Sequence, residues 1–286
     1  MEKLTIKNGD FESVGALFEV ENAVGVVLLV HGSLEHKERY YPFIKHLNKC
    51  GLTALIFDIR GHGESVDENY PRGYMKNSYE IVSDLEAWLN LLETKYPKLP
   101  KYLFGHSLGT VFCRLLLQKS ADKFEKVALS GTVPPQKLAV VGKALSKLFP
   151  AHGHSQFLNS LAAIKKDDSW ISTSKTNLDA YRADPLNTKR WQNSGAKVVF
   201  ESVQKMGKLK LYTSKNDSLQ VALFSGALDP ITKGEKGLSK SILLLNKLGF
   251  KHVTSHIFEN MKHEILNEDD NLQVFEQISN FFLKKS

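Results

Sequence analysis

The chain has 286 residues, of which 42% are hydrophobic and 24% charged, and its net charge is +7. This apolar content is enough for one large core and argues against disorder as the overall state. The lysines are scattered, with no basic block or aromatic-interleaved patch, so we expect no nucleic-acid partner. Cys50 and Cys113 have neither disulfide-framework nor zinc-ligand spacing, and we interpret them as buried small residues in a reducing compartment.

The amino terminus, Met1-Glu2-Lys3, lacks the charged-then-apolar order of a signal peptide. The apolar run Val24 to Val30 is far too short to span a bilayer. We therefore expect a soluble, cytoplasmic protein, and peripheral attraction of its positive charge to anionic membranes stays open as an alternative. The residues do not determine an oligomeric state.

In chain order, the first predicted element is a hairpin, because Leu4 to Lys7 and Gly15 to Phe18 flank the turn residues Asn8-Gly9-Asp10. After it, short apolar runs alternate with longer segments whose apolar residues recur at helical spacing. The predicted strands are Val24 to Val30, Leu52 to Asp58, Tyr102 to Gly105, Lys126 to Ser130, Leu219 to Ser225 and Val253 to Phe258. The predicted helices are Tyr40 to Cys50, Ser78 to Tyr96, Leu108 to Lys119, Leu238 to Leu248 and Asn271 to Leu283. This alternation is typical of the α/β class, with a mostly parallel central sheet flanked by helices.

One segment breaks the alternation. From residue 134 to residue 196 the sequence has no strand-like run, only short helical stretches interrupted by prolines and glycines. We predict that residues 134–196 form a helical cap inserted over the sheet. Residues 1–133 and 197–286 would then form the core domain.

Within the insertion, one predicted helix carries an apolar stripe, although Gly142 weakens that prediction. The apolar residues that share this face are Leu138, Val141, Leu145, Leu148 and Phe149, with Lys143 and Lys147 on the opposite side. We interpret the stripe as a cap face packed on the core. The alternatives are a face that contacts a membrane and a face that holds a substrate acyl chain through Leu145, Leu148 and Phe149.

The motif that carries most information is Gly105-His106-Ser107-Leu108-Gly109, which follows a predicted strand and precedes a predicted helix. In this context the serine occupies a tight, strained turn that lifts its hydroxyl above the sheet. Flanking glycines are needed because side chains there would collide with neighbouring backbone. The motif predicts Ser107 as a catalytic nucleophile.

A serine hydroxyl is a poor nucleophile until a base takes its proton, so this hypothesis requires an acid and then a histidine further along the chain. Asp229 lies just past the predicted strand that ends at Ser225, and His263 follows the strand that ends near Phe258. Active-site loops of open α/β sheets collect at these strand ends. We predict His263 as the general base and Asp229 as the acid that orients it. The alternatives are that His263 is a surface histidine and that Asp229 is only a turn residue.

Acyl transfer also needs two backbone N–H groups that face the oxyanion of the tetrahedral intermediate. Leu108 supplies one by its position after the nucleophile. The turn that ends at Ser33 follows a predicted strand, and we expect the N–H of Ser33 to supply the second. Glu35, His36 and Arg39 in the same loop either shape it through hydrogen bonds or are solvated charges.

Taken together, these residues resemble monoacylglycerol lipases and related bacterial lysophospholipases within the α/β hydrolases. The segments that carry the resemblance span nearly the whole chain: His31 to His36, Arg39-Tyr40, Phe57 to Ser65, Gly105 to Gly109, Asp184-Pro185-Leu186, and the Asp229 and His263 loops. The resemblance implies the α/β-hydrolase fold, a triad of Ser107, Asp229 and His263, and oxyanion donors at Ser33 and Leu108. It also implies that the cap supplies an apolar groove for one acyl chain.

The expected reaction is a two-step acyl transfer, in which Ser107 attacks an ester carbonyl, His263 passes the proton to the leaving alcohol, and water releases the acid. It needs no metal or organic cofactor. The expected substrate is a small single-chain lipid ester, a monoacylglycerol or lysophospholipid, with transient membrane contact through the cap left open. The alternatives are a short-chain carboxylesterase, an aminopeptidase and a non-catalytic ligand-binding protein. Thr110 departs from the family pattern, because many relatives carry a second glycine there.

Overall fold

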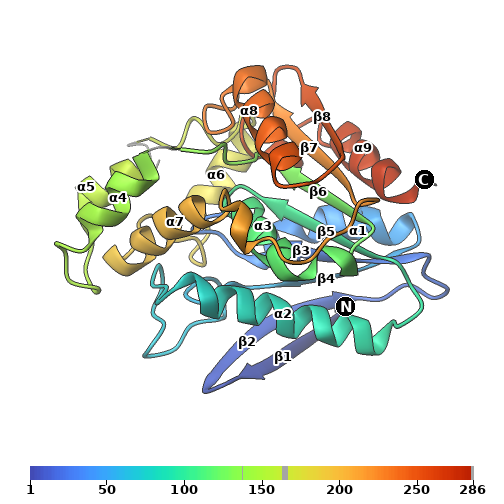
Figure 1. Ribbon diagram of the computed structural model, residues 1–286, viewed down its shortest axis with the longest axis horizontal. Coiled ribbons are helices and arrows are strands. Elements are labelled where there is room, and N and C mark those ends of the chain that lie inside the picture. Colours follow the sequence, from blue (N-terminus) through green and yellow to red (C-terminus); the bar gives the residue numbers. More distant parts are fainter. Residues whose placement is uncertain (137, 163–166, 285–286) are drawn as a thin grey trace.

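The computed structural model describes residues 1–136, 138–162 and 167–284, and within them the chain forms an eight-stranded sheet (Figure 1). The strands lie in the order β1-β2-β4-β3-β5-β6-β7-β8. Strands β1 and β2 form an antiparallel hairpin that joins β4, and all later neighbours are parallel. Their bounds are β1 Glu2–Asn8, β2 Phe11–Phe18, β3 Gly25–Val30, β4 Leu52–Phe57, β5 Lys101–His106, β6 Lys126–Ser130, β7 Gln220–Gly226 and β8 His252–Phe258. The predicted mostly parallel α/β sheet is confirmed.

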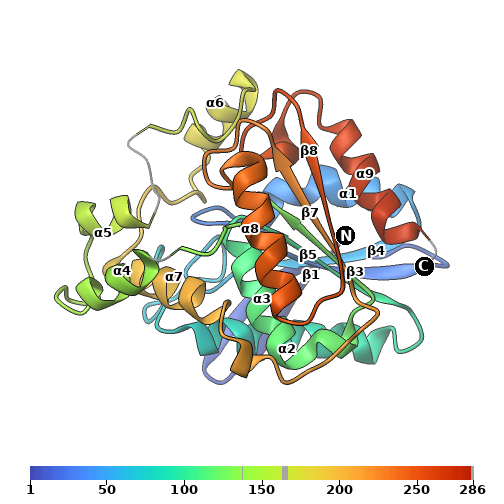
Figure 2. The ribbon, with the colours of Figure 1, turned by 45° about the horizontal axis from the view of Figure 1, so that its top comes forward.

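Helices cover both faces of the sheet (Figures 1 and 2). Their bounds are α1 Tyr41–Lys49, α2 Ser78–Lys95, α3 Leu108–Ser120, α4 Leu138–Ser146, α5 Gln156–Leu161, α6 Lys175–Ala183, α7 Asn193–Lys205, α8 Gly234–Lys247 and α9 Leu272–Leu283. Helices α1 and α9 pack on one face through residues such as Phe43 and Phe282. Helices α2, α3 and α8 pack on the other through residues such as Trp88 and Leu245. Burial on both faces explains why the central strands are nearly continuous apolar runs.

A local sequence signal explains the start of α2. The side chain of Asn77 caps α2 by accepting the backbone N–H of Glu80 at 2.9 Å. Most predicted helices begin and end within a few residues of the observed ones. Helix α8 begins at Gly234 rather than at Leu238, because its first turn is polar and apolar periodicity does not detect it.

Both cysteines are free. Cys113 is buried within α3, where its Sγ lies 3.7 Å from the carbonyl oxygen of Phe104. Cys50 is only half-buried at the end of α1. The prediction of two buried cysteines is therefore correct for Cys113 and wrong for Cys50, which closes an amphipathic helix at the surface.

Between β6 and β7 the described part of the chain contains helices α4 to α7 and no strand, as the sequence predicts for the insertion. Residues 138–162, with α4 and α5, are called here the outer unit, and residues 167–192, with α6, the anchored unit. Figure 1 shows α4 and α5 at the edge of the molecule, far from the sheet. The predicted cap boundary at residue 196 lies inside α7, and the division into core and cap stays a prediction.

Candidate active site

The serine of the G-x-S-x-G motif occupies a strained turn between β5 and α3. Ser107 has φ 50° and ψ −118°, a backbone conformation that side-chain-bearing residues rarely adopt. Its N–H donates to the carbonyl oxygen of Ser130 at 2.9 Å. A Cβ atom on Gly109 would lie 2.3 Å from the carbonyl oxygen of Val30, so only glycine allows α3 to approach β3 this closely. The predicted turn is therefore present, for the predicted reason.

The three residues predicted to form a triad lie in one hydrogen-bonded row. Nε2 of His263 lies 2.8 Å from Oγ of Ser107, and Nδ1 of His263 lies 2.9 Å from Oδ2 of Asp229. Because a carboxylate only accepts, Nδ1 donates to Asp229 and Nε2 is left to accept the serine proton. Asp229 also accepts the N–H of Ile231 and the hydroxyl of Thr232, each at 2.7 Å. These contacts fix the carboxylate that orients the imidazole.

The electrostatics of this row favour an imidazole that can hold a proton. Burial alone would raise the pKa of Asp229, but the charge and hydrogen bond of His263 outweigh it and lower that pKa to about 2. Burial alone would lower the pKa of His263, but Asp229 outweighs it and raises that pKa. His106, whose ring lies 4.8 Å from that of His263, keeps a pKa well below the ordinary value because it is fully buried. A neutral His106 leaves the positive charge to His263.

The loop that follows β3 is held in a defined conformation next to Ser107. His31 donates from Nδ1 to the carbonyl oxygen of Gly32 at 2.8 Å, and its Nε2 accepts the N–H of Ile59 at 2.9 Å. Ser33 and Leu108, whose N–H groups are the predicted oxyanion donors, line the same cavity as Ser107. The structure thus brings all five predicted site residues to one place.

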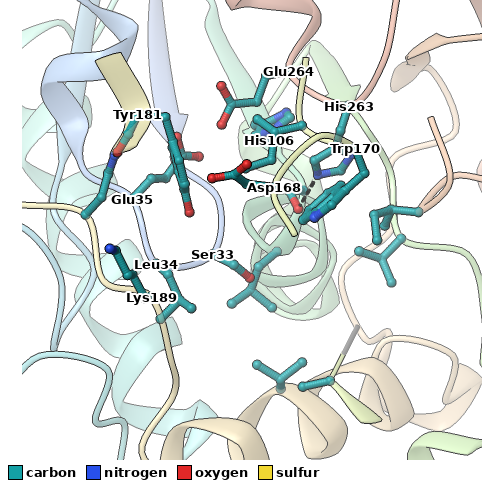
Figure 3. Close-up of a pocket in the computed structure, with 18 of the residues that line it drawn as sticks. Ser33, Leu34, Glu35, His106, Asp168, Trp170, Tyr181, Lys189, His263 and Glu264 are labelled. Atoms are coloured by element: carbon teal, nitrogen blue, oxygen red, sulfur yellow. Dashed lines mark hydrogen bonds between the residues drawn. The ribbon is translucent and has the colours of Figure 1, made fainter. Parts of the chain in front are cut away.

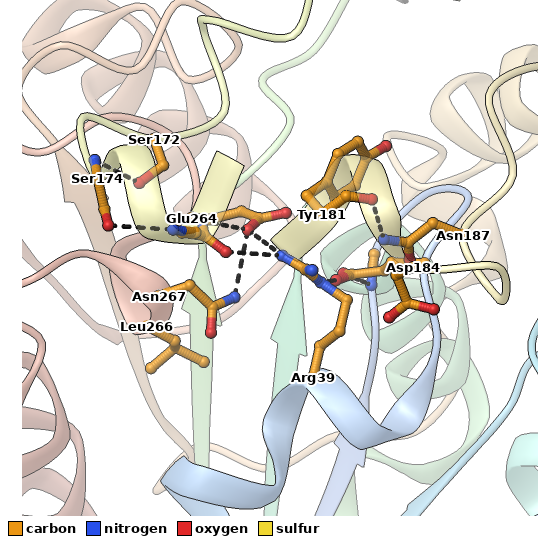
Figure 4. Close-up of polar contacts among 12 residues, drawn as sticks. Arg39, Ser172, Ser174, Tyr181, Asp184, Asn187, Glu264, Leu266 and Asn267 are labelled. Carbon is orange, nitrogen blue, oxygen red and sulfur yellow. Dashed lines mark hydrogen bonds and ion pairs between the residues drawn. The ribbon is translucent and has the colours of Figure 1, made fainter. Parts of the chain in front are cut away.

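A buried ionic cluster supports this loop. The carboxylate of Glu35 accepts the N–H of Gly32 and the hydroxyl of Tyr40, each at 2.6 Å. Arg39 lies between two carboxylates, pairing with Glu35 at 3.1 Å and with Glu264, the residue after the triad histidine (Figure 4). Burial, and then the neighbouring Glu264, raise the pKa of Glu35. Of the two interpretations of Glu35 and Arg39, the structure supports the one in which they shape the loop.

Further polar contacts attach the anchored unit to the core around the site. Nε2 of His36 lies 2.7 Å from Asp184, which belongs to the Asp-Pro-Leu motif. The buried carboxylate of Glu268 accepts the N–H groups of Thr173, at 2.9 Å, and of Ser174, at 3.1 Å. The anchored unit is therefore positioned by largely buried hydrogen bonds close to the triad.

A cavity of about 610 Å³ opens at Ser107 and His263 (Figure 3). The apolar lining residues, largely from α4, α7 and the end of α5, are Leu108, Val133, Ala139, Leu161, Ala162, Val199, Phe200, Val203 and Ile231. The polar lining residues come from the anchored unit and from the loops that follow β3 and β8. They include Glu35, Asp168, Tyr181, Arg182, Asp184, Asn187, Lys189 and Glu264. The ring of Trp170 lies 5.0 Å from that of His263 at one wall. A cavity of this size and two-sided lining suits a small molecule with one apolar and one polar end.

The predicted apolar stripe of the insertion lies elsewhere. Helix α4 ends at Ser146, and the side chains of Val141 and Leu148 are 50% and 77% exposed. Leu145 and Phe149 are half-buried, and neither they nor Leu148 line the cavity. The interpretation of the stripe as a face packed on the core is wrong for Val141 and Leu148, and the alternative that Leu145, Leu148 and Phe149 hold the acyl chain is wrong. The side chain of Leu138 lies outside the described residues.

Helix α4 instead buries its small residues. Ala139, Gly142 and Ser146 form the face that packs on α7. A Cβ atom on Gly142 would lie 2.8 Å from the ring of Phe200, so the glycine permits a close contact between the two helices. Helical periodicity identifies a helix with two different faces, and the prediction assumed that the face with the larger apolar side chains is buried. In the structure the face with the small residues is buried instead, because α4 packs closely on α7.

Some site residues were missed from the sequence. Glu264 and Thr232 stand next to predicted residues, and their proximity to His263 and Asp229 was the available signal. Trp170 carries no local signal, because only the tertiary fold brings its loop onto His263. For Arg39 the sequence left two interpretations open, because its second carboxylate partner, Glu264, comes from a distant segment.

Comparisons with known proteins agree with this geometry. The family model described as serine aminopeptidase, S33, matches residues 21–270. The chain belongs to this hydrolase family. It is a serine hydrolase of the α/β-hydrolase fold.

Relatives narrow the resemblance further. The monoacylglycerol lipase of Mycolicibacterium smegmatis is 23% identical over 266 residues, which cover 91% of this chain and 88% of that protein. The phospholipase YtpA of Bacillus subtilis is 26% identical over 267 residues, covering 90% and 95%. Among solved structures, a lipase in its open form superimposes with a TM-score of 0.85 at 20% identity, covering 98% of this chain and 96% of that one. The predicted resemblance to the monoacylglycerol lipase and lysophospholipase group is confirmed.

Proposed function

We propose that the protein hydrolyses the carboxylic ester of a single-chain lipid, a monoacylglycerol or a lysophospholipid, through an acyl-enzyme on Ser107. In this mechanism His263 takes the serine proton and gives it to the leaving alcohol, and Asp229 holds the imidazole and stabilises its positive charge. The N–H groups of Ser33 and Leu108 stabilise the oxyanion. The hydrogen-bonded row of 2.8 and 2.9 Å is the observation that carries the proposal.

The two-sided cavity supports the lipid-ester substrate. An acyl chain on the apolar lining from α4 and α7 would gain about 0.8 kcal/mol for each buried methylene. A glycerol or phosphorylated alcohol on the polar lining would reach groups such as Lys189 and Asn187. A general short-chain carboxylesterase is the alternative, and it would leave the apolar lining largely unused.

The description of the family as aminopeptidases raises the question of a peptide substrate. Such a substrate needs free carboxylates to hold its amine, whereas the cavity carboxylates have partners. Glu35 and Glu264 share Arg39, Asp168 pairs with Arg182 at 2.6 Å, and Asp184 pairs with His36. These pairings favour an ester of a neutral or phosphorylated alcohol over a peptide with a free amine.

The outer unit supports a transient contact with a lipid surface. The exposed apolar residues Val140, Val141 and Leu148 lie on and just after α4, with Lys143 and Lys147 among them. Apolar side chains interspersed with lysines are typical of interfacial helices. In the described residues no helix is long and apolar enough to cross a membrane. We propose that the outer unit rests on the surface from which the substrate is taken.

The decisive experiment for the proposed nucleophile is Ser107→Ala. Removal of the hydroxyl should lower hydrolysis of monooleoylglycerol by roughly 10⁴-fold or more and leave the fold intact. A fluorophosphonate probe should label the wild type and not the variant, which also distinguishes an enzyme from a non-catalytic binding protein. Ser160→Ala, on the exposed side of α5, is the matched control and should be labelled normally. A Ser107→Ala enzyme with a tenth of the wild-type activity would refute the assignment.

The role of Asp229 predicts a specific pH dependence. Wild-type kcat/KM should fall as the pH drops through the raised pKa of His263, because a protonated imidazole cannot accept the serine proton. Asp229→Asn removes the charge that raises this pKa, so the acid limb should move to lower pH while turnover drops by about 10⁴-fold. The pH profile of kcat/KM measures both effects. Asp168→Asn removes a cavity carboxylate that pairs with Arg182 instead, and it should leave the acid limb in place.

A further inference from the structure

Helix α3 contains a fully buried arginine whose charge has no carboxylate partner among the described residues. Arg114 is 0% exposed and lies two turns after Ser107. Burial lowers the pKa of its guanidinium to about 10, so it keeps its charge at neutral pH. Its Nη1 atom has no hydrogen-bond partner in the described structure. A buried, unpaired cation is costly, and one that is retained calls for a physical reason.

The guanidinium is directed back toward the start of α3. Its Nη2 donates to Oγ1 of Thr110 at 3.3 Å and to the carbonyl oxygen of Val133 at 2.7 Å. The N–H of Val133 also approaches Oγ1 of Thr110, at 3.4 Å. The hydroxyl of Thr132 donates to the same oxygen at 3.4 Å. Because the guanidinium and the N–H of Val133 can only donate, the hydroxyl of Thr110 must accept from them. Its single proton is left for another acceptor.

That acceptor is the carbonyl oxygen of Ser107, which lies 2.7 Å from Oγ1 of Thr110. This carbonyl belongs to the same planar peptide group as the N–H of Leu108. A hydrogen bond accepted by an amide oxygen increases the polarisation of the whole amide, so its N–H becomes a stronger donor. The N–H at the other end of this peptide is the proposed oxyanion donor.

We propose that Arg114 and Thr110 form a relay that strengthens the oxyanion hole by polarising the Ser107–Leu108 peptide. The relay runs from the Arg114 guanidinium through the Thr110 hydroxyl to the Ser107 carbonyl, and from there through the peptide to the Leu108 N–H. Both are positioning residues, since neither lines the cavity. The inference rests on the proposed function, because the relay matters only if an oxyanion forms at Ser107.

The relay also gives a role to Thr110, the position at which the chain departs from its family pattern. A glycine there could not supply the hydroxyl, and Arg114 would lose the acceptor at 3.3 Å. The two residues are therefore expected to act as a unit. When two residues act as a unit, the fold-losses in kcat caused by the two single substitutions do not multiply in the double variant.

The test uses Thr110→Val, which keeps the side-chain shape without the hydroxyl, and Arg114→Met, which removes the charge from a similar volume. Loss of one donor from an oxyanion hole costs about 10²- to 10³-fold, and cooperative strengthening is about 10–30% of a bond, so each variant should lower kcat roughly two- to tenfold. KM should stay nearly constant. Affinity for an alkylboronic acid, which forms an anionic tetrahedral adduct with the serine, should fall by the same factor as kcat.

Binding of a non-hydrolysable glycerol alkyl ether should be unchanged in both variants, since it forms no oxyanion. Thr110→Ser keeps the hydroxyl and should keep most of the wild-type kcat. The double variant should be no slower than the slower single variant. Leu117→Ala, a buried and purely apolar change further along α3, controls for loss of helix stability and should leave the boronic acid affinity unchanged.

The relay is refuted if Thr110→Val keeps full kcat, if the two losses multiply in the double variant, or if boronic acid and ether weaken together. Arg114→Met should melt at the wild-type temperature or higher, because apolar replacement of a buried charge is often stabilising. If Ser107→Ala destroys activity while Thr110→Val does not affect it, only the relay fails. If Ser107→Ala remains active, the proposed function fails first.

Discussion

The outer and anchored units of the insertion are attached to the molecule in different ways. The anchored unit is held by buried polar groups, such as His36 with Asp184 and the Glu268 carboxylate with Thr173. The outer unit is held by the contact of α4 with α7 and by hydrogen bonds to residues 191–194, of which those between Asn159 and Trp191 are buried. Polar contacts need defined geometry, whereas small-residue packing requires only close approach.

This difference follows what each unit does at the cavity. The anchored unit places the ring of Trp170 5.0 Å from that of His263. Its Asn177 accepts a hydrogen bond, at 3.2 Å, from Arg39 of the loop that follows β3. The outer unit supplies only apolar lining, for which position matters less, and it presents Val141 and Leu148 to solvent. The part of the insertion next to the triad is therefore held in a defined position, whereas the part farther from the triad exposes apolar side chains to solvent.

The largest expected effect is at the buried ionic cluster of Arg39, Glu35 and Glu264, where Arg39 also donates to Asn177 of the anchored unit. Arg39→Met would leave Glu35 and Glu264 as two buried carboxylates without their shared cation, which should cost about 3–5 kcal/mol. At about 2–4 °C for each kcal/mol, the melting temperature should fall by roughly 6–20 °C. The loss should be smaller at pH 5 than at pH 8, because the pKa of Glu35 is raised and its protonation removes one of the charges.

The matched control is Arg182→Met in the same unit. Arg182 is about half exposed and pairs with Asp168 at the surface of the cavity, so its loss should lower the melting temperature far less than the loss of Arg39. Thermal melts of both variants at the two pH values measure the comparison. Equal losses would mean that the buried ionic cluster contributes no more to stability than a partly exposed ion pair.

An intermediate effect is expected where the outer unit meets the cavity. Phe200 is buried, lines the cavity and contacts α4 at Gly142. Phe200→Ala therefore removes apolar contact both from the cavity wall and from α4. The ratio of kcat/KM for monooleoylglycerol to that for monoacetylglycerol should fall about tenfold or more, since only the long chain reaches this wall. The ratio cancels any loss of folded enzyme. An unchanged ratio would place the acyl chain elsewhere.

The smallest effect on the folded molecule is expected on the outer face of α4. Val141→Ser and Leu148→Ser should change the free energy of unfolding by less than about 0.5 kcal/mol, because these side chains are already exposed. The same variants should weaken sedimentation with anionic vesicles and leave hydrolysis of a dissolved short ester unchanged. Normal vesicle binding by both variants together would exclude this face as the membrane contact.

The proposed catalytic residues could be identified from the sequence because their signals are local. Ser107 stands in a five-residue motif whose glycines are required by the close approach of α3 to β3, and Asp229 and His263 follow buried strands in the required order. Parallel strands bring their carboxyl ends to one edge of a sheet, so sequence order predicts spatial proximity. The boundaries of the central strands were predicted closely because strands buried on both faces are nearly continuous apolar runs.

Tertiary structure decided what depends on which surfaces meet. The sequence of α4 shows a two-faced helix, but the fit of Gly142 against Phe200 determined that its small face is buried. The whole sequence shows Arg39 and Arg114 only as charges. The fold gives Arg39 two buried carboxylates and, within the part of the chain that the structure describes, gives Arg114 none. A local pattern carries hydrophobicity and turn propensity, whereas burial and charge compensation depend on segments that are far apart in the chain.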